Sequence, residues 1–232
     1  MDKAQPATLI TEDLLPGDLL FQLRSGGEAE WVISRLFAGR DGIALNHVAI
    51  YDGDGQVIEA IMPDVCKTTL DAFVDASVRD GRGRPCVLVC RVLPEYSHLV
   101  TPVLEFAEQL VASPYDPHYG AHNKQGADES PSGKQSWYCS ELVVDAFREA
   151  NGGQYLFKET PMGFRDMDTG ELMPFWVDHY QAIGRSIPEG KPGSHPALLS
   201  CSDKLTPVNT MGALPARDVR DWQSLEPGVA LA

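Results

Sequence analysis

The spacing of apolar residues along the chain predicts several short strands and short helices. Apolar runs predict strands at 19–21, directly after a Pro-Gly turn, and at 87–92, and alternating positions predict a β-hairpin over 47–60. Apolar residues at helical spacing predict helices at 30–37, 70–78, 101–111 and 138–150. The chain is therefore expected to mix short strands with short helices.

Two stretches lack this regular spacing. Residues 113–136 are rich in Pro, Gly, Ser, Asn and Asp, which predicts a long loop. Loops of this length often have a functional role. From residue 154 onward the chain has many prolines and glycines and few periodic runs. We therefore expect a catalytic domain over residues 1–153, followed by an irregular C-terminal extension over residues 154–232 that packs on the site or covers it.

The overall composition excludes several classes of protein. A chain of 232 residues with 43% hydrophobic content can form one packed core and is not expected to be disordered. Its formal net charge of −14 argues against a nucleic-acid partner and against docking on anionic membranes. No apolar run approaches the roughly 18 residues of a membrane span, and residues 1–10 do not resemble a Sec signal peptide. We expect a chain that is made in the cytoplasm.

The cysteines favour a reducing compartment and give no metal pattern. Their number is odd and their spacing irregular, which argues against a disulfide framework: Cys66, Cys86, Cys90, Cys139 and Cys201. No CxxC pair occurs, and the HxxxH spacing of His118 and His122 falls in a Pro/Gly-rich loop. We therefore predict no metal site and no cofactor.

One of these cysteines, Cys139, stands where the long loop ends and an amphipathic helix begins. A helix N-terminus carries partial positive charge, which favours a thiolate, and its unpaired N–H groups can bind an oxyanion. Cys139 is therefore a candidate nucleophile. A buried helical cysteine without a chemical role is an equally good interpretation of this spacing.

The hairpin carries one titratable side chain on each strand. His47 opens the first strand, where Tyr51 shares its face, and Glu59 interrupts an apolar second strand. A buried glutamate is rare unless it is paired, so His47 is its natural partner across the hairpin. Placing His47 directly opposite Glu59 leaves residues 52–54 as the loop, with Gly55 as a left-handed bulge residue. The spacing is compatible with a triad of nucleophile, base and carboxylate but does not require it.

Three segments resemble the NlpC-type cell-wall peptidases, which are papain-like thiol enzymes. These segments are His-Val-Ala-Ile-Tyr through Ile-Glu-Ala at 47–60, Tyr-Cys-Ser-Glu-Leu-Val at 138–143, and Leu-Pro-Gly-Asp-Leu-Leu-Phe at 15–21. The histidine strand precedes the cysteine helix here, as it does in the circularly permuted YiiX/YebB-like branch of that superfamily. The resemblance covers roughly residues 14–150.

The resemblance implies an α+β, papain-like, circularly permuted fold, in which a small antiparallel sheet packs against the nucleophile helix. It also implies that Cys139 is the nucleophile, that His47 is the general base and that Glu59 orients the base. Glu59 stands where the unpermuted branch has a histidine. Tyr138 and Tyr51 are candidate oxyanion or substrate-binding residues, and core packing is the alternative for Tyr138.

The implied function is that of a cysteine peptidase or amidase that cleaves peptidoglycan stem peptides through a thioester on Cys139. A thioester-forming acyltransferase or deacylase on lipid or amine substrates is one alternative, and a non-catalytic papain-fold binding module is another. Peptidoglycan lies outside the cytoplasm, yet no Sec signal is recognised. This leads to the hypothesis of an antibacterial effector that leaves by a specialised secretion system and has a cognate immunity protein.

Overall fold

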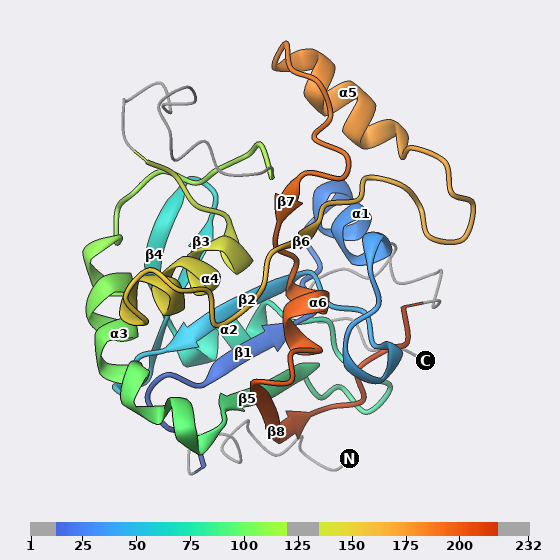
Figure 1. Ribbon diagram of the computed structural model, residues 1–232. Coiled ribbons are helices and arrows are strands. Elements are labelled where there is room, and N and C mark those ends of the chain that lie inside the picture. The colour runs from blue at the N-terminus through green and yellow to red at the C-terminus, as the bar shows by residue number, and fades with distance from the viewer. Residues whose placement is uncertain (1–12, 120–134, 218–232) are drawn as a thin grey trace.

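The computed structural model describes residues 13–119 and 135–217. Its centre is an antiparallel sheet of six strands in the order β4-β3-β2-β1-β5-β8 (Figure 1). The strands are β1 (Leu19–Gln22), β2 (His47–Tyr51), β3 (Gln56–Ile61), β4 (Asp64–Thr69), β5 (Val87–Val92) and β8 (Leu205–Met211). The predicted antiparallel sheet is confirmed, including the hairpin and the strand at 87–92.

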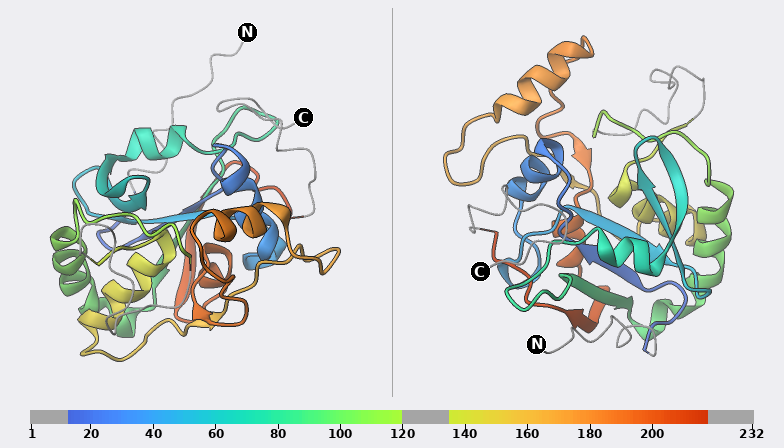
Figure 2. Two further views of the ribbon diagram at one scale, coloured as in Figure 1. Left: turned by 90° about the horizontal axis from the view of Figure 1, so that it is seen from above. Right: turned by 180° about the vertical axis from the view of Figure 1, so that it is seen from behind.

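Helices cover both faces of this sheet, as the view from above in Figure 2 shows. One face is covered by α3 (Val100–Gln109), α4 (Cys139–Ala150) and α6 (Pro196–Ser200), and the other by α2 (Leu70–Asp75). Beside the sheet, α1 (Glu28–Leu36) packs against α5 (Pro174–Ala182). Short pieces complete the fold: η1 (Arg40–Gly42), η2 (Pro94–Leu99), and the pair β6 (Thr160–Pro161) and β7 (Pro192–Gly193). None of the helices in 13–119 and 135–217 is long and apolar enough to cross a membrane.

Strand β2 shows how the sequence builds the two layers. Val48 and Ile50 point into the core beneath α4, while Ala49 and Tyr51 point into the core beneath α2. All four side chains are buried, because successive residues of a strand face opposite sides of the sheet and both sides are covered. The strand that carries His47 is therefore fixed from above and below.

The hairpin has a register different from the one predicted. Tyr51 pairs with Val57 rather than with Gly55, so that His47 is displaced by two residues from a position directly opposite Glu59. The prediction of a directly opposed pair is therefore wrong. An offset of two residues nevertheless keeps both side chains on one face of the sheet, because the side-chain period of a strand is two.

Asp52 explains the longer turn. Its carboxylate accepts the N–H of Asp54 at 2.8 Å and that of Gln56 at 3.2 Å, so the side chain holds the turn in place of the strand ladder. Gly53 and Gly55 have φ of 100° and 77°, which only glycine adopts readily. Gly55 thus has the left-handed conformation that was predicted, within a longer loop.

The C-terminal part of the described chain adds an edge to the sheet. Strand β8 pairs with β5, and the register shifts between Val89 and Cys90, where Pro207 faces the strand. Proline cannot donate to a ladder and is confined to edges and bulges, which is why the sequence pattern gave no sign of this strand. The predicted boundary between residues 153 and 154 stays a prediction.

A buried ion pair fastens the Leu-Pro-Gly-Asp turn to the sheet. Asp18 is fully buried and accepts hydrogen bonds from Arg91 on β5, at 2.7 Å from Nε and 2.8 Å from Nη2. The Leu15 N–H donates to the same carboxylate at 2.8 Å. A bidentate ion pair of this kind fixes both the distance and the relative orientation of Asp18 and Arg91. It therefore holds the turn in a defined orientation where the chain enters β1.

Replacing Asp18 by alanine is expected to lower the free energy of unfolding by about 2–3 kcal/mol, because Arg91 loses its buried partner but remains partly hydrated. Urea denaturation measures this loss. The exposed Asp54 is a matched control, and Asp54→Ala is expected to cost less than about 0.5 kcal/mol. Equal unfolding midpoints for the two variants would contradict the structural role of Asp18.

Candidate active site

Helix α4 begins at the predicted nucleophile. Cys139 is its first residue, and Tyr138 before it has an extended backbone, so the chain enters the helix directly at the cysteine. Leu142, Val143 and Phe147 are fully buried on the face of α4 that packs on the sheet. The first N–H groups of a helix have no acceptor within it, so the Cys139 N–H can bind an oxyanion that forms next to the Cys139 sulfur.

The predicted base and carboxylate lie in direct contact. The Nε2 atom of His47 lies 2.6 Å from Oε2 of Glu59, and both side chains are almost fully buried. His47 also forms a side-chain hydrogen bond with Cys139. Since Nε2 is occupied by Glu59, the other ring nitrogen, Nδ1, is the one left for the cysteine. The structure therefore brings Cys139, His47 and Glu59 together in that order.

The electrostatics of the pair describe an imidazolium and a carboxylate. Burial lowers the pKa of His47, but hydrogen bonds to Cys139 and Glu59 and the negative charges of these groups raise it to about 9. Burial raises the pKa of Glu59, but the bonds from His47 and Thr68 and the charge of Arg24 bring it below the ordinary value. At neutral pH the site thus holds a charged His47 beside an ionised Glu59.

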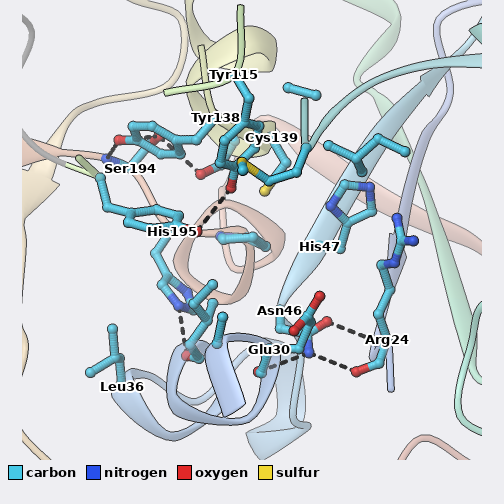
Figure 3. Close-up of a pocket in the computed structure, with 18 of the residues that line it drawn as sticks. Arg24, Glu30, Leu36, Asn46, His47, Tyr115, Tyr138, Cys139, Ser194 and His195 are labelled. Atoms are coloured by element: carbon cyan, nitrogen blue, oxygen red, sulfur yellow. Dashed lines mark hydrogen bonds between the residues drawn. The ribbon is translucent and has the colours of Figure 1, made fainter. Parts of the chain in front are cut away.

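The triad opens into a cavity of about 240 Å³. In Figure 3, Cys139 and His47 face this cavity from one side, and Ser194 and His195 face it from another. Most of the remaining lining is apolar or aromatic: Ile33, Leu36, Ala60, Ile61, Met62, Tyr115, Tyr119, Tyr138, Met162, Phe164 and Trp176. A substrate next to the sulfur would therefore meet a largely apolar surface with a few fixed polar groups.

Three tyrosines form one wall of the cavity. Tyr115 donates a hydrogen bond to Tyr119 at 3.1 Å, and the rings of Tyr119 and Tyr138 lie 5.9 Å apart. Burial raises the pKa of Tyr115 and Tyr138 well above the ordinary phenol value and that of Tyr119 to about 12, so all three are neutral. The predicted residue Tyr138 does line the cavity, while its hydroxyl accepts the Ser194 N–H at 3.0 Å.

The other predicted tyrosine lies elsewhere. Tyr51 packs in the core beneath α2 with Phe73, and its hydroxyl accepts the N–H of Gly55 at 3.2 Å. It is not among the residues that line the cavity. Sharing a strand face with His47 therefore does not bring Tyr51 to the cavity, because Tyr51 lies four residues further along β2.

A second histidine faces the cavity that the sequence interpretation did not single out. His195 accepts the Ala197 N–H at Nδ1, 3.1 Å away, and its Nε2 donates to the Ile33 carbonyl at 2.9 Å. Burial lowers the pKa of His195 to about 4, although the bond to Ile33 opposes this effect. Both ring nitrogens are occupied and the ring is neutral, so His195 shapes the cavity rather than moving protons.

Asn46, directly before His47, ties three segments together. Its side chain accepts the Arg24 N–H at 2.7 Å and donates to the carbonyl oxygens of Arg24 and Glu30, both at 2.9 Å. These bonds join the end of β1 and the first turn of α1 to the start of β2. Sequence reasoning missed Asn46, and an asparagine next to a candidate base at the start of a strand was the available signal.

The described residues show no group of three or more His, Cys, Asp or Glu side chains that could hold a metal ion. His118 lies beside Asp116, with Nδ1 2.9 Å from the carboxylate, and His122 lies outside the described residues. Cys66, Cys86, Cys90 and Cys201 are free thiols away from the cavity lining.

Comparison with known proteins identifies the family. The model of the permuted papain-like amidases of the YaeF/YiiX type, the C92 family, matches residues 13–209. This chain belongs to the C92 family. Its members are papain-like amidases or cysteine peptidases, so the enzyme class and the permuted papain-like fold predicted from the sequence are confirmed. None of the curated proteins compared with this C92 chain matches it.

A solved structure shares the C92 chain's fold. The crystal structure of the metalloprotein yiiX from Escherichia coli O157:H7 is 19% identical, with a TM-score of 0.60. The match covers 86% of this chain and 98% of yiiX. At this level of identity the similarity shows a shared fold. The chemistry of the C92 site depends on the residues described above.

Proposed function

We propose that this C92 protein is a cysteine amidase in which Cys139, His47 and Glu59 carry the chemistry. The observation that supports this most strongly is the chain of contacts at the start of α4. The His47 ring binds Cys139 on one side and, at 2.6 Å, Glu59 on the other, beside a largely apolar cavity. A nucleophile, a base within reach and a group that orients the base are what thiol acyl transfer requires.

In the proposed reaction, the Cys139 thiolate attacks the carbonyl carbon of an amide, and the N–H groups at the start of α4 bind the oxyanion. Nδ1 of His47 gives its proton to the leaving nitrogen, the C–N bond breaks, and a thioester forms on the sulfur. Water then attacks the thioester and gives a proton to Nδ1. The C–S bond breaks, a carboxylic acid leaves, and the thiolate and imidazolium are restored.

We further propose that the protein is related to the NlpC superfamily and that its substrate is a peptidoglycan stem peptide. The support is the resemblance of residues 47–60 and 138–143 to the histidine and cysteine segments of cell-wall peptidases. The test is incubation of purified sacculi with the wild type and with Cys139→Ala, followed by analysis of the muropeptides. New muropeptides with the wild type alone are expected. Identical profiles for both proteins would remove this substrate.

The apolar wall of the cavity favours a second candidate, an acyltransferase or deacylase on lipid or amine substrates. Phe164, Trp176 and Met162 would suit an acyl chain as well as a peptide side chain. Adding a primary amine to the reaction separates these functions. A transferase gives an amide of the added amine, whereas a hydrolase gives the free acid. A non-catalytic binding module would form no thioester with either type of substrate.

The effector hypothesis concerns where the amidase acts. Under this hypothesis the protein attacks peptidoglycan of another cell and a cognate immunity protein protects the producer. Expression directed to the periplasm is expected to be toxic for the wild type, harmless for Cys139→Ala, and harmless for both proteins in the cytoplasm. Equal toxicity of wild type and Cys139→Ala in the periplasm would contradict it.

A further inference from the structure

Arg24 and His47 meet at a single oxygen of Glu59. The Nη1 atom of Arg24 lies 3.4 Å from Oε2, the oxygen that is 2.6 Å from Nε2 of His47. The Glu59 side chain is 1% exposed, whereas that of Arg24 is 25% exposed and lines the cavity. The buried carboxylate therefore has two cationic partners, and only His47 can give up its proton, because a guanidinium stays protonated in proteins.

The main chain of Arg24 is held rigidly next to the base. Its N–H and carbonyl group both bind the Asn46 side chain, at 2.7 and 2.9 Å, and Asn46 immediately precedes His47. On its other side Arg24 forms a bridge with Ser77. The backbone of Arg24 is therefore held in place by the residue next to His47. The guanidinium group reaches Glu59 from this fixed backbone position.

The charge balance at Glu59 changes during the reaction. In the resting site the His47 imidazolium compensates the carboxylate. Once His47 has given its proton to the leaving nitrogen, that compensation is gone, and burial then favours a protonated Glu59. A protonated Glu59 would donate to Nε2 instead of accepting from it. The His47 proton would then sit on Nδ1, the position that must be free to accept a proton from water.

We propose that Arg24 is a positioning residue for thioester hydrolysis, whose fixed charge keeps Glu59 ionised while His47 is neutral. Nε2 then keeps its proton, which it donates to Glu59, and Nδ1 presents its lone pair to the attacking water. Water gives its proton to Nδ1, its oxygen bonds to the acyl carbon, and the C–S bond to Cys139 breaks. This inference rests on the nucleophile and base assigned under the proposed function, and it concerns the second half of the reaction.

The other groups around this pair do not supply the charge. From β4, Cys66 stands opposite Glu59 in the ladder and Thr68 contributes a hydrogen bond. Burial raises the pKa of Cys66, so it is a neutral thiol near the carboxylate. From α4, Cys139 faces His47, and in the thioester its sulfur carries no charge. Among the described residues, Arg24 is thus the one permanent cation at Glu59.

The test uses p-nitrophenyl acetate, which separates the two half-reactions without requiring the natural substrate. The burst of nitrophenol reports formation of the thioester on Cys139, and the steady-state rate reports its hydrolysis. Arg24→Gln is expected to keep the burst rate within about threefold of the wild type and to lower the steady-state rate by about tenfold or more. The acid limb of the steady-state rate is expected to move to higher pH, because Glu59 then takes up a proton more easily.

Three variants make the expectation specific. Arg24→Lys keeps the charge and is expected to recover most of the steady-state rate. Arg79→Gln is the matched control, since Arg79 is 24% exposed and pairs with Asp75 away from the site, and both phases should stay unchanged. In a Glu59→Gln background, adding Arg24→Gln should change hydrolysis by less than about twofold, because Arg24 acts through the Glu59 charge.

Several results would overturn the inference. These are an equal loss of burst and steady-state rate in Arg24→Gln, an equal loss in the Lys and Gln variants, or an undiminished effect of Arg24→Gln when Glu59 is already Gln. A wild type with no Cys139-dependent burst would instead contradict the nucleophile assignment and remove both proposals. Failure on sacculi alone would remove only the peptidoglycan substrate.

Discussion

His47→Ala is expected to lower the steady-state hydrolysis of p-nitrophenyl acetate by about 10³-fold while the protein stays folded. In the proposed reaction His47 supplies both the proton for the leaving group and the base for water. The alanine leaves Glu59 buried with Arg24 as its partner, so some loss of stability is expected. Circular dichroism and thermal unfolding therefore accompany the rate measurement.

The same cavity offers a comparison for this variant. His195 also faces the cavity, but its ring is neutral, with a pKa of about 4, and bonded at both nitrogens. His195→Asn keeps an acceptor for the Ala197 N–H and should lower the rate by at most about tenfold, through a small change of cavity shape. An equal loss of hydrolysis rate in His47→Ala and His195→Asn would contradict the assignment of His47 as the base.

Glu59→Gln is expected to narrow the pH range in which Cys139 reacts. In the wild type the carboxylate helps to raise the pKa of His47 to about 9, so His47 remains an imidazolium up to that pH. The amide keeps the shape but removes the charge, while burial continues to lower the His47 pKa. The alkaline limb should therefore move to lower pH by about one unit or more, and steady-state hydrolysis should fall by about 10²-fold.

Alkylation of Cys139 by iodoacetate, followed by mass spectrometry across the pH range, measures this limb without any substrate, because this anionic reagent is attracted by the charged His47 and reacts more slowly once that charge is lost. Glu95→Gln provides the control, because Glu95 is exposed on η2, away from the site, and its variant should keep the wild-type profile. An alkaline limb that stays near pH 9 in Glu59→Gln would show that Glu59 does not set the charge of His47.

The parts of the site that sequence reasoning predicted are those with a strong local signal. A carboxylate in an apolar strand indicated that Glu59 needs a partner, and parity along the hairpin placed His47 on the same face. The register was wrong by two residues, because the Asp52 side chain extends the turn in a way that residue counting does not include. A shift of two residues leaves both side chains on the same face of the sheet, so the contact between His47 and Glu59 was still predicted correctly.

The rest of the cavity could not be predicted because its residues come from distant parts of the chain. Ser194 and His195 belong to a Pro/Gly-rich stretch whose strands and helices are too short to leave a period in the sequence. Arg24 follows a four-residue strand, and nothing near it in the sequence indicates a contact with residue 59. Such contacts are set by the packing of layers rather than by local propensity.

The proline in β8 has a consequence for how copies of this protein behave toward one another. An open sheet exposes unpaired N–H and C=O groups at both outer strands, which can template pairing with a second chain. At one border Pro207 and the register shift beside it interrupt that template. At the other border residues 112–115 bind along β4, with Ala112 donating to Val65 at 2.8 Å and Tyr115 to Pro63 at 2.9 Å. The segment that shields this border also carries Tyr115 to the cavity wall, so protection against edge-to-edge aggregation and the shape of the site depend on the same short stretch of chain.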